Sequence, residues 1–519
     1  MVPMGSGTVA VLGNGPVGQT AALLLARWGV RVVVVDGRPG RDRIGSKSIC
    51  QQRDVLDVWD SVGAGRAIAA EGVTWTTART FCRDRELFAY ALPDPGVSAF
   101  PPFVNISQSR TEEILDGRIA AQPLIDVRWD HEVTGIDQDD AGVTVTCRTG
   151  GGTREIRADY AVAATGAHGG VRRMLGVAFD GRSFDDLFLI CDIRADLPGW
   201  ANERRFYFDP SWNPGRQVLI HPCPGRTFRI DWQVPAGYDL AAEEVSGGLD
   251  ARIRAIVGDR PYEVVWKSVY RFSSRVADRM RVGRVLLAGD CAHVYSPFGA
   301  RGLNSGVADA ENAAWKLAYA LRGEAGPGLL ESYHAERHAA ALENLEVTSA
   351  TMDFLVPQDD AARRHRADVL ARAATDVAAR RQVDSGRLAE PFWYVASPLT
   401  TPDPERPFAG RPPRGHVPPP GPGILLPDAP VTARRGRMRA LARDGFLALT
   451  TEGVTLRDAP VPVLALADID RTGGLAKALG ARSGEIWLVR PDAYVAAVLY
   501  DPADLSAALR RALGEVVTG

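Results

Sequence analysis

A carboxylate and a glycine-rich loop stand close together in the second half of the chain. Residues 285–288 are a short apolar run that predicts a buried strand, and Asp290 follows this run after one glycine. Residues 296–302 are rich in proline and glycine and lead into Asn304 and an amphipathic helical pattern. A carboxylate can accept hydrogen bonds from sugar-like hydroxyls, and the bare N–H groups at a helix start can hold an oxyanion. This arrangement predicts a site for a polar ligand.

A second pattern of this kind stands near the start of the chain. Residues 8–36 predict a strand, a helix and a second buried strand, in that order. Gly13, Gly15 and Gly18 form a GxGxxG between the first strand and the helix, and Asp36 ends the second strand. This spacing is typical of a dinucleotide-binding unit. Its glycines permit the turn, the approach of a pyrophosphate and close helix packing, while the acid accepts a ribose hydroxyl.

One FAD that spans both patterns explains them most simply. Its ADP half would lie on residues 13–36, and its ribityl and flavin half on Asp290 and residues 299–304. Two separate nucleotide sites are the alternative, but the second pattern lacks a GxGxxG. The polar, basic loop after the second strand supplies three further candidates for phosphate and ring contacts, Arg38, Lys47 and Gln51.

Length, charge and cysteine spacing exclude several classes of protein. The 519 residues suggest roughly two to four domains. The net charge of −2 gives no reason to expect nucleic acid or an anionic membrane as a partner. No apolar run of about 18 residues predicts a spanning helix, and no secretory signal precedes the first strand. The six cysteines are scattered without a CxxC pair, so we expect a reduced, cytoplasmic protein without disulfides or a metal site.

The middle of the chain predicts a sheet that forms the wall of a ligand pocket. Residues 184–269 are mostly β in pattern and rich in large aromatic side chains, most of which we expect in the ordinary core. His221, Arg229 and Tyr207 are the candidates for activating a substrate, and Asp231 is a further polar position in the same wall. Each of these side chains alone is more often structural than catalytic.

These motifs resemble those of the single-component FAD-dependent aromatic hydroxylases, the para-hydroxybenzoate hydroxylase type. The resemblance is closest to the branch of 3-(3-hydroxyphenyl)propionate, phenol and polyketide hydroxylases that carries a C-terminal thioredoxin-like domain. It covers nearly the whole chain. The similar segments are GNGPVG, RVLLAGDCAHVYSPFGARGLNSGVADAENAAWKLA and, more weakly, RPDAY at residues 490–494.

The resemblance implies roles for individual residues. Asp290 would bind the ribityl chain, and Pro297 would lie beside the flavin ring. Gln108 would contact the cofactor, and the backbone at Val133 would flank the adenine. The backbone of the glycine-rich loop and helix start would face the pyrimidine edge of the flavin: Gly299, Ala300, Arg301, Gly302, Leu303 and Asn304. The cofactor-binding set also includes the first motif and the loop after it: Gly13, Gly15, Val17, Gly18, Asp36, Arg38, Lys47 and Gln51.

Pattern and resemblance together predict an α/β fold. A discontinuous Rossmann-like FAD-binding domain holds an inserted, mostly β substrate domain, followed by a helical segment, a Pro-rich linker and a thioredoxin-like α/β domain. The FAD-binding domain is expected at residues 1–182 with 268–325, and the substrate domain at 73–107 with 183–267. The helical segment is expected at 326–390, the Pro-rich linker at 391–432 and the thioredoxin-like domain at 433–519. Within the helical segment, residues 359–387 predict one long helix. The last domain contains no cysteine, so a redox role is excluded there and a structural or dimerisation surface is expected.

The chain departs from the family pattern at three places. Thr165 stands where an acid usually precedes Gly166, Lys47 stands where arginine is common, and Arg301 replaces the usual glutamine of the glycine-rich loop. The first departure concerns a motif that the family links to both FAD and NAD(P)H. It therefore bears on the handling of the pyridine nucleotide.

The resemblance implies a monooxygenase. NAD(P)H and O2 would be used to hydroxylate a small phenolic or other electron-rich aromatic substrate through a C4a-hydroperoxyflavin. N-oxygenation, epoxidation and Baeyer–Villiger chemistry are alternatives that the sequence does not separate from hydroxylation. A flavin dehydrogenase or oxidase without oxygen insertion, and a flavin-binding sensor or structural protein, are the rival classes. A homodimer is implied by the resemblance alone.

Overall fold

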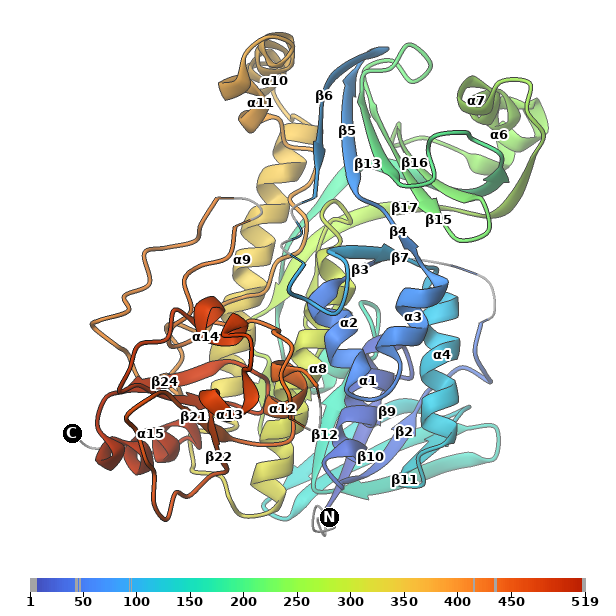
Figure 1. The fold of residues 1–519 in the computed structure, drawn as a ribbon. Coiled ribbons are helices and arrows are strands. Elements are labelled where there is room, and N and C mark those ends of the chain that lie inside the picture. Colours follow the sequence, from blue (N-terminus) through green and yellow to red (C-terminus); the bar gives the residue numbers. More distant parts are fainter. Residues whose placement is uncertain are drawn as a thin grey trace.

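The computed structural model describes residues 7–42, 45, 48–92, 94, 96–413, 416–433 and 436–515, with only the backbone at residue 185. Lys47 lies outside the described residues, so its phosphate contact stays a prediction. Among the described helices, none combines the length and apolar character needed to span a bilayer. The chain forms an α/β fold with two large sheets (Figure 1).

The first large sheet is mostly parallel. It contains β1 (Thr8–Leu12), β2 (Arg31–Val35), β8 (Ile125–Arg128), β12 (Tyr160–Ala163), β19 (Val285–Leu287) and the antiparallel edge strand β18 (Arg281–Val282), in the order β18-β19-β12-β1-β2-β8. Its central strands are continuous apolar runs because both faces of a parallel sheet are covered. α1 (Pro16–Arg27) connects β1 to β2. It begins at Pro16, three residues before the predicted helix, because proline suits the first turn of a helix.

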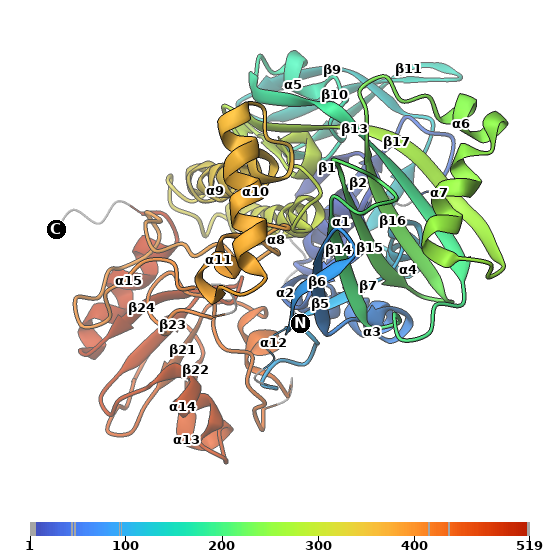
Figure 2. The same cartoon turned by 90° about the horizontal axis from the view of Figure 1, so that it is seen from above.

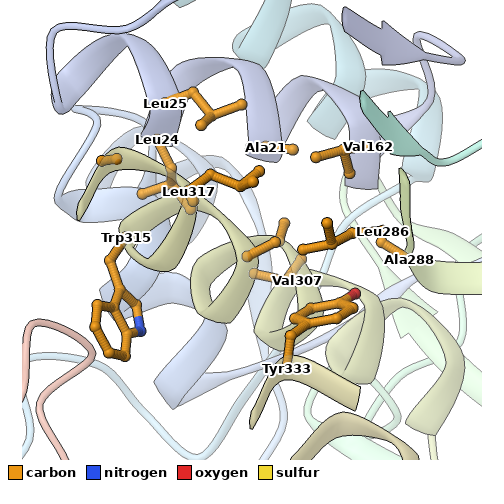
Figure 3. Close-up of a cluster of buried hydrophobic side chains, with 14 of the residues drawn as sticks. Ala21, Leu24, Leu25, Val162, Leu286, Ala288, Val307, Trp315, Leu317 and Tyr333 are labelled. Atoms are coloured by element: carbon orange, nitrogen blue, oxygen red, sulfur yellow. The ribbon is translucent and has the colours of Figure 1, made fainter. Parts of the chain in front are cut away.

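The core of this half lies where α1 packs against α8 (Arg301–Leu321), as Figure 3 shows. Leu24 of α1 and Leu317 of α8 point into one buried cluster that also contains side chains of the parallel sheet. Tyr333 of α9 (Glu331–Leu355) closes the cluster and donates its hydroxyl to a backbone oxygen of β19 at 2.6 Å. This packing fixes the start of α8 relative to the loop after β1, and both line the site described below.

The second large sheet has the order β20-β17-β13-β16-β15-β14-β5-β6 and is antiparallel except between β14 and β5. Its strands are β20 (His293–Val294), β17 (Tyr262–Ala277), β13 (Phe179–Ala195), β16 (Thr227–Val234), β15 (Gln217–Cys223), β14 (Glu203–Phe208), β5 (Thr77–Cys82) and β6 (Arg85–Ala91). Two short helices, α6 (Leu240–Ser246) and α7 (Gly248–Val257), cover one face. The domain boundaries expected after residues 182 and 267 fall inside β13 and β17, so continuous strands connect the two parts there.

Two three-stranded sheets and several short helices complete the first 300 residues. One sheet has the order β3-β7-β4 and the other β11-β10-β9. These strands are β3 (Cys50–Gln52), β7 (Phe103–Asn105), β4 (Val73–Thr74), β11 (Gly152–Ala158), β10 (Gly142–Thr149) and β9 (Glu132–Asp139). The helices are α2 (Arg53–Asp60), α3 (Gly65–Glu71), α4 (Gln108–Ala120) and α5 (Val171–Met174).

The single helix predicted over residues 359–387 is wrong. The chain forms α10 (Asp360–Ala373) and α11 (Val377–Gln382), with a break between them, and then an irregular segment. Asp376 ends the break because its side chain accepts a hydrogen bond from the N–H of Ala378 and so caps a new helix.

The C-terminal unit is a four-stranded mixed sheet with short helices. The order is β22-β21-β23-β24, with β21 and β22 parallel and the other pairs antiparallel. Its elements are α12 (Met438–Ala442), β21 (Leu447–Thr450), β22 (Val463–Ala465), α13 (Leu466–Ile469), α14 (Gly474–Leu479), β23 (Ile486–Val489), β24 (Val495–Leu499) and α15 (Leu505–Ala512). Figures 1 and 2 both place this unit beside α8 and α9 and away from α6 and α7.

A fully buried charge cluster ties the C-terminal unit to α8 and α9. Glu336 of α9 accepts hydrogen bonds from both terminal nitrogens of Arg490 and from Nζ of Lys316 at 2.7 Å. Arg490 also pairs with Asp492, which accepts from the indole N–H of Trp315 at 3.1 Å. RPDAY, the weakest part of the family resemblance, therefore supplies buried charged contacts rather than an exposed loop.

Candidate cofactor and substrate site

A cavity of about 700 Å³ lies between the two large sheets. On one side are the loops that follow β1, β2, β12 and β19, which is where open parallel sheets bind ligands. On the other side is the face of the second sheet opposite to the one that α6 and α7 cover. Fifteen of the predicted site residues line this one cavity: Gly13, Gly15, Val17, Asp36, Arg38, Gln108, His221, Arg229, Asp290, Pro297, Gly299, Ala300, Arg301, Gly302 and Leu303.

The three glycines of GNGPVG differ in what they make possible. Gly13 has φ +102°, and a Cβ there would lie 2.4 Å from the backbone oxygen of Ala164. A Cβ at Gly18 would lie 1.9 Å from the oxygen of Gly13, so this glycine serves packing and does not line the cavity. Gly15 has extended backbone and no atom within 4 Å of a Cβ position. Neither conformation nor packing requires glycine at residue 15, so its missing side chain leaves room in the cavity for a ligand.

The end of β2 presents an ionised carboxylate. Oδ2 of Asp36 accepts from the N–H of Asn14 at 2.8 Å, and its two oxygens accept from Nε and Nη2 of Arg38 at 2.9 Å. Burial opposes ionisation, but these hydrogen bonds outweigh it and lower the pKa of Asp36. Glu132 of β9 lines the cavity beside this carboxylate, whereas the neighbouring Val133 does not.

A charged network that sequence reasoning missed lies beside the same loop. Arg41 donates to Glu112 at 2.7 Å and to the backbone oxygen of Asn14 at 3.0 Å, and it forms an ion pair with Asp116. Gln108, which was predicted, donates to Glu112 at 2.8 Å. These partners lie far apart in sequence, so no local pattern points to Arg41.

Asp290 lies in a tight turn, Gly289–Cys291, at the end of β19. The N–H of Gly289 donates to Asp309 of α8 at 2.9 Å, and Asp309 also accepts from Arg337 and contacts Nε2 of His293, both at 2.7 Å. Burial opposes ionisation of Asp309, but His293 and Arg337 lower its pKa. Asp309 thus holds the turn that presents Asp290, and the buried His293 contributes a contact to the same carboxylate.

α8 begins at Arg301, within the predicted helix start of residues 299–304, directly after Ala300, which adopts a left-handed conformation with φ 56°. Asn304 lies one turn inside the helix and does not line the cavity. Its side chain accepts from the N–H of Gln52 and donates to the backbone oxygens of Cys50 and Ala300. The side chain of Asn304 therefore links β3 to α8, and the contact of its backbone with the flavin stays a prediction. Gln51 also lies outside the lining, with both polar atoms of its buried amide unpartnered in the described structure.

The segment 384–389 forms a strap across the glycine-rich loop. Arg301 donates to the backbone oxygens of Arg387 at 3.1 Å and Leu388 at 3.0 Å, and the N–H of Ala389 donates to the backbone oxygen of Gly299 at 2.7 Å. A Cβ at Gly299, where φ is +107°, would lie 2.2 Å from the oxygen of Arg387. Leu388 completes this part of the cavity wall. Sequence reasoning extended a helix to residue 387 and missed the contribution of this segment to the site.

The prediction that Tyr207 faces the substrate is wrong. Successive side chains of a strand point to opposite faces. Tyr207 lies on the face covered by α6 and α7, where its ring stacks on Phe81 at 4.5 Å and meets Trp212 edge-on at 5.5 Å. The adjacent Phe206 belongs to the cluster on the other face, which includes Phe298 of the glycine-rich loop.

The cavity face of the second sheet carries a row of polar side chains. His221 of β15 is directly opposite Arg229 of β16, and Leu219 is opposite Asp231. Arg229 forms a bidentate ion pair with Asp192, at 2.8 and 2.9 Å. Burial and the nearby arginines hold the pKa of His221 well below its usual value, so this imidazole is neutral.

Asp231 is a buried carboxyl whose burial raises its pKa to about 7. At pH values between the ordinary pKa of an aspartate and about 7, this carboxyl is protonated in the folded protein but ionised in the unfolded chain. The free energy of unfolding therefore falls as the pH rises through this range. We predict that Asp231→Asn raises the thermal unfolding midpoint relative to the parent protein more at pH 8 than at pH 5. An equal difference at both pH values would contradict this account.

The observed features fit an FAD that spans the cavity. Gly15 leaves space at a helix N-terminus, Asp36 offers an ionised acceptor, and Asp290 stands at the far strand end. The side chain of Asn14, which is buried next to the same turn, has no hydrogen-bond partner for its amide in the described structure. Such orphaned polar atoms are expected where a polar ligand completes the site.

Comparison with known proteins decides the family. The model of the FAD binding domain family matches residues 6–348. The chain belongs to this FAD-binding family. The flavoprotein is 31% identical over 367 residues to a 3-(3-hydroxy-phenyl)propionate/3-hydroxycinnamic acid hydroxylase of Comamonas testosteroni. That match covers 70% of the flavoprotein but only 61% of the relative's length. The flavoprotein is also 31% identical over 394 residues to the para-nitrophenol 4-monooxygenase of Pseudomonas sp. strain WBC-3. This second match covers 72% of the flavoprotein and 93% of that relative.

Solved structures extend the likeness to the whole flavoprotein. The substrate-free rebeccamycin biosynthetic enzyme RebC matches with a TM-score of 0.75 and 26% identity, covering 98% of the flavoprotein and 99% of RebC. The flavin-dependent monooxygenase PieE, solved with FAD and substrate, shares the fold with a TM-score of 0.84 at 24% identity, over 98% and 99% of the two chains. The predicted family and α/β fold are confirmed, and the match includes the C-terminal unit.

Proposed function

We propose that the protein is an NAD(P)H- and FAD-dependent monooxygenase that hydroxylates a phenolic or other electron-rich aromatic compound. The observation that carries this proposal is the single cavity, in which the cofactor loops face the polar row of the second sheet. The names of the curated relatives support it, because both denote enzymes that oxygenate phenols. When bound, FAD accepts electrons from the nicotinamide and supplies them to O2 for transfer of one oxygen atom.

The residues of this chain would bind the FAD, orient it and shield the reacting atoms from water. Asp36 and the space at Gly15 would hold the adenosine and pyrophosphate, and Asp290 would hold the ribityl hydroxyls. The first turn of α8 would place its N–H groups and positive dipole end near negative charge on the reduced flavin. Phe298 and Leu388 of the strap give this part of the cavity an apolar lining, which would limit water beside the reacting atoms and so favour oxygen transfer.

A flavin oxidase or dehydrogenase without oxygen insertion is the second candidate. It is favoured by Thr165, which lines the cavity where the family usually has an acid and donates its hydroxyl to Cys291 at 3.5 Å. N-oxygenation, epoxidation and Baeyer–Villiger reactions would use the same cofactor site. The cytoplasmic location, the use of O2 and a homodimer stay predictions.

The discriminating experiment follows NAD(P)H consumption by the FAD-loaded protein in air, with and without a panel of phenols. We expect at least one phenol to accelerate consumption and to yield a hydroxylated product, with little hydrogen peroxide. Consumption that yields hydrogen peroxide in equal amount, with every phenol recovered unchanged, would instead support the oxidase.

A further inference from the structure

The cavity wall contains a cation that forms no direct ion pair with a carboxylate of the described residues. Arg204 of β14 lines the cavity and is 2% exposed. Its guanidinium donates to the backbone oxygen and to the hydroxyl of Ser385, in the strap, and its interactions with the described carboxylates are Coulombic only. Burial lowers its pKa, which is the expected response of a desolvated cation without a close counter-ion.

The carboxylate of Asp384, next to Ser385, attracts Arg204 without a direct ion pair, and its oxygens accept hydrogen bonds from Thr351 and from the N–H of Gly386. The remaining groups of this wall offer Arg204 little further negative charge. Arg229 is matched by the carboxylate of Asp192, so this pair is neutral as a unit. His221 is neutral because its pKa is depressed, and the thiols of Cys50 and Cys223 are neutral because burial raises each pKa to about 12. Asp231, with a pKa near 7, carries at most part of a charge at neutral pH.

A buried charge is costly unless a partner of opposite charge and good hydrogen-bond geometry accompanies it. Arg204 cannot move away to solvent, because Ser385 holds its guanidinium from the strap side and Phe206 lies under it at 5.4 Å. The planar guanidinium presents several N–H donors in a fixed fork, which matches two oxygens of a carboxylate or a single phenolate oxygen. A ligand oxyanion would therefore find both charge and donors already in place.

We propose that Arg204 binds an oxyanion of the aromatic substrate, a carboxylate or a phenolate, and so makes the cavity selective for anionic aromatic compounds. The inference rests on the proposed function, because it concerns the substrate half of the same cavity. Arg204 is then a specificity-determining residue, and the strap positions it through Ser385.

The test measures equilibrium binding to the FAD-loaded protein without NAD(P)H, from the change in flavin absorbance. Two pairs of probes differ in charge: 3-hydroxybenzoate with 3-hydroxybenzamide, and 4-cyanophenol above its pKa with 4-cyanoanisole. The first pair measures the preference for a carboxylate, and the second pair measures the preference for a phenolate. We expect the parent protein to prefer the anion of at least one pair by about 10-fold or more, the size of a hydrogen bond to a charged group.

Arg204→Met should abolish that preference and leave binding of the neutral probe within about threefold, because Met fills similar space without charge. Arg204→Lys keeps the charge but loses the fork, so it should retain a reduced preference. Arg205→Met is the matched control, since Arg205 is the next residue of β14 and pairs with Glu203 on the other face. It should leave the preference unchanged.

Equal binding of anion and neutral probe in both pairs, or a preference that survives in Arg204→Met, overturns the assignment. Should Arg204→Met fail to fold, an anion preference undiminished in Arg204→Lys would contradict it equally. The two proposals fail separately. Oxygen transfer without charge preference refutes the role of Arg204 alone, whereas an anion preference without oxygen transfer refutes the monooxygenase proposal alone.

Discussion

Gly15→Val should give a folded protein that purifies without bound FAD. Residue 15 has φ −82° and ψ −179°, an extended conformation that valine adopts readily, and no protein atom lies within 4 Å of its Cβ position. The new methyl groups would instead occupy the part of the cavity where the pyrophosphate approaches the backbone. We expect affinity for FAD to fall by at least about 100-fold, equivalent to about 3 kcal/mol.

The measurement compares flavin absorbance per protein, the dissociation constant of FAD and the unfolding midpoint of the FAD-free protein. Gly237→Val is the matched control, because its Cβ position is also open and it lies in a turn away from the cavity. It should bind FAD like the parent protein. A Gly15→Val protein that retains a full complement of FAD would show that the cofactor does not lie on this turn.

Glu336→Ala should destabilise the protein by about 3–5 kcal/mol, the usual cost of leaving a buried charge without its partner. Lys316 would lose its only carboxylate partner among the described residues, and Arg490 would keep only Asp492. All four side chains are almost completely buried, so water cannot take the place of the missing oxygens. Such a loss is a large fraction of the stability of an ordinary domain.

Urea unfolding and limited proteolysis of the C-terminal unit measure this effect. Glu331→Ala on the same helix is the matched control, because Glu331 pairs with Arg281 at the surface and its side chain is 68% exposed. Surface pairs contribute about 0–1 kcal/mol, so its unfolding midpoint should hardly change. If both variants unfolded alike, the buried cluster would not hold the C-terminal unit to α8 and α9.

The cofactor half of the site could be predicted because its signals are local. GNGPVG, with a strand before it and Asp36 after the next strand, fixes a turn whose geometry depends on neighbouring residues. The same holds for Asp290 and the glycine-rich loop. The structure places both segments on one cavity, although 250 or more residues separate them, because the strands that precede them lie in the same parallel sheet.

The substrate half could be predicted only in part. The alternation along β14 shows that residues 206 and 207 lie on opposite faces of the sheet, but it does not show which face lines the cavity. The prediction for Tyr207 therefore placed its side chain on the wrong face. Arg204 and the strap were missed for another reason. Their contact joins residues 181 positions apart, and it depends on where α11 ends and the chain returns to the glycine-rich loop.

The origin of the oxygen atom in the product distinguishes a monooxygenase from an oxidase. The FAD-loaded protein would be supplied with NAD(P)H, an accepted phenol and ¹⁸O₂, and the product analysed by mass spectrometry. We expect a hydroxylated product that contains one ¹⁸O atom per molecule of nicotinamide oxidised. Nicotinamide oxidation with all ¹⁸O recovered as hydrogen peroxide or water, and none in an organic product, would contradict the monooxygenase proposal.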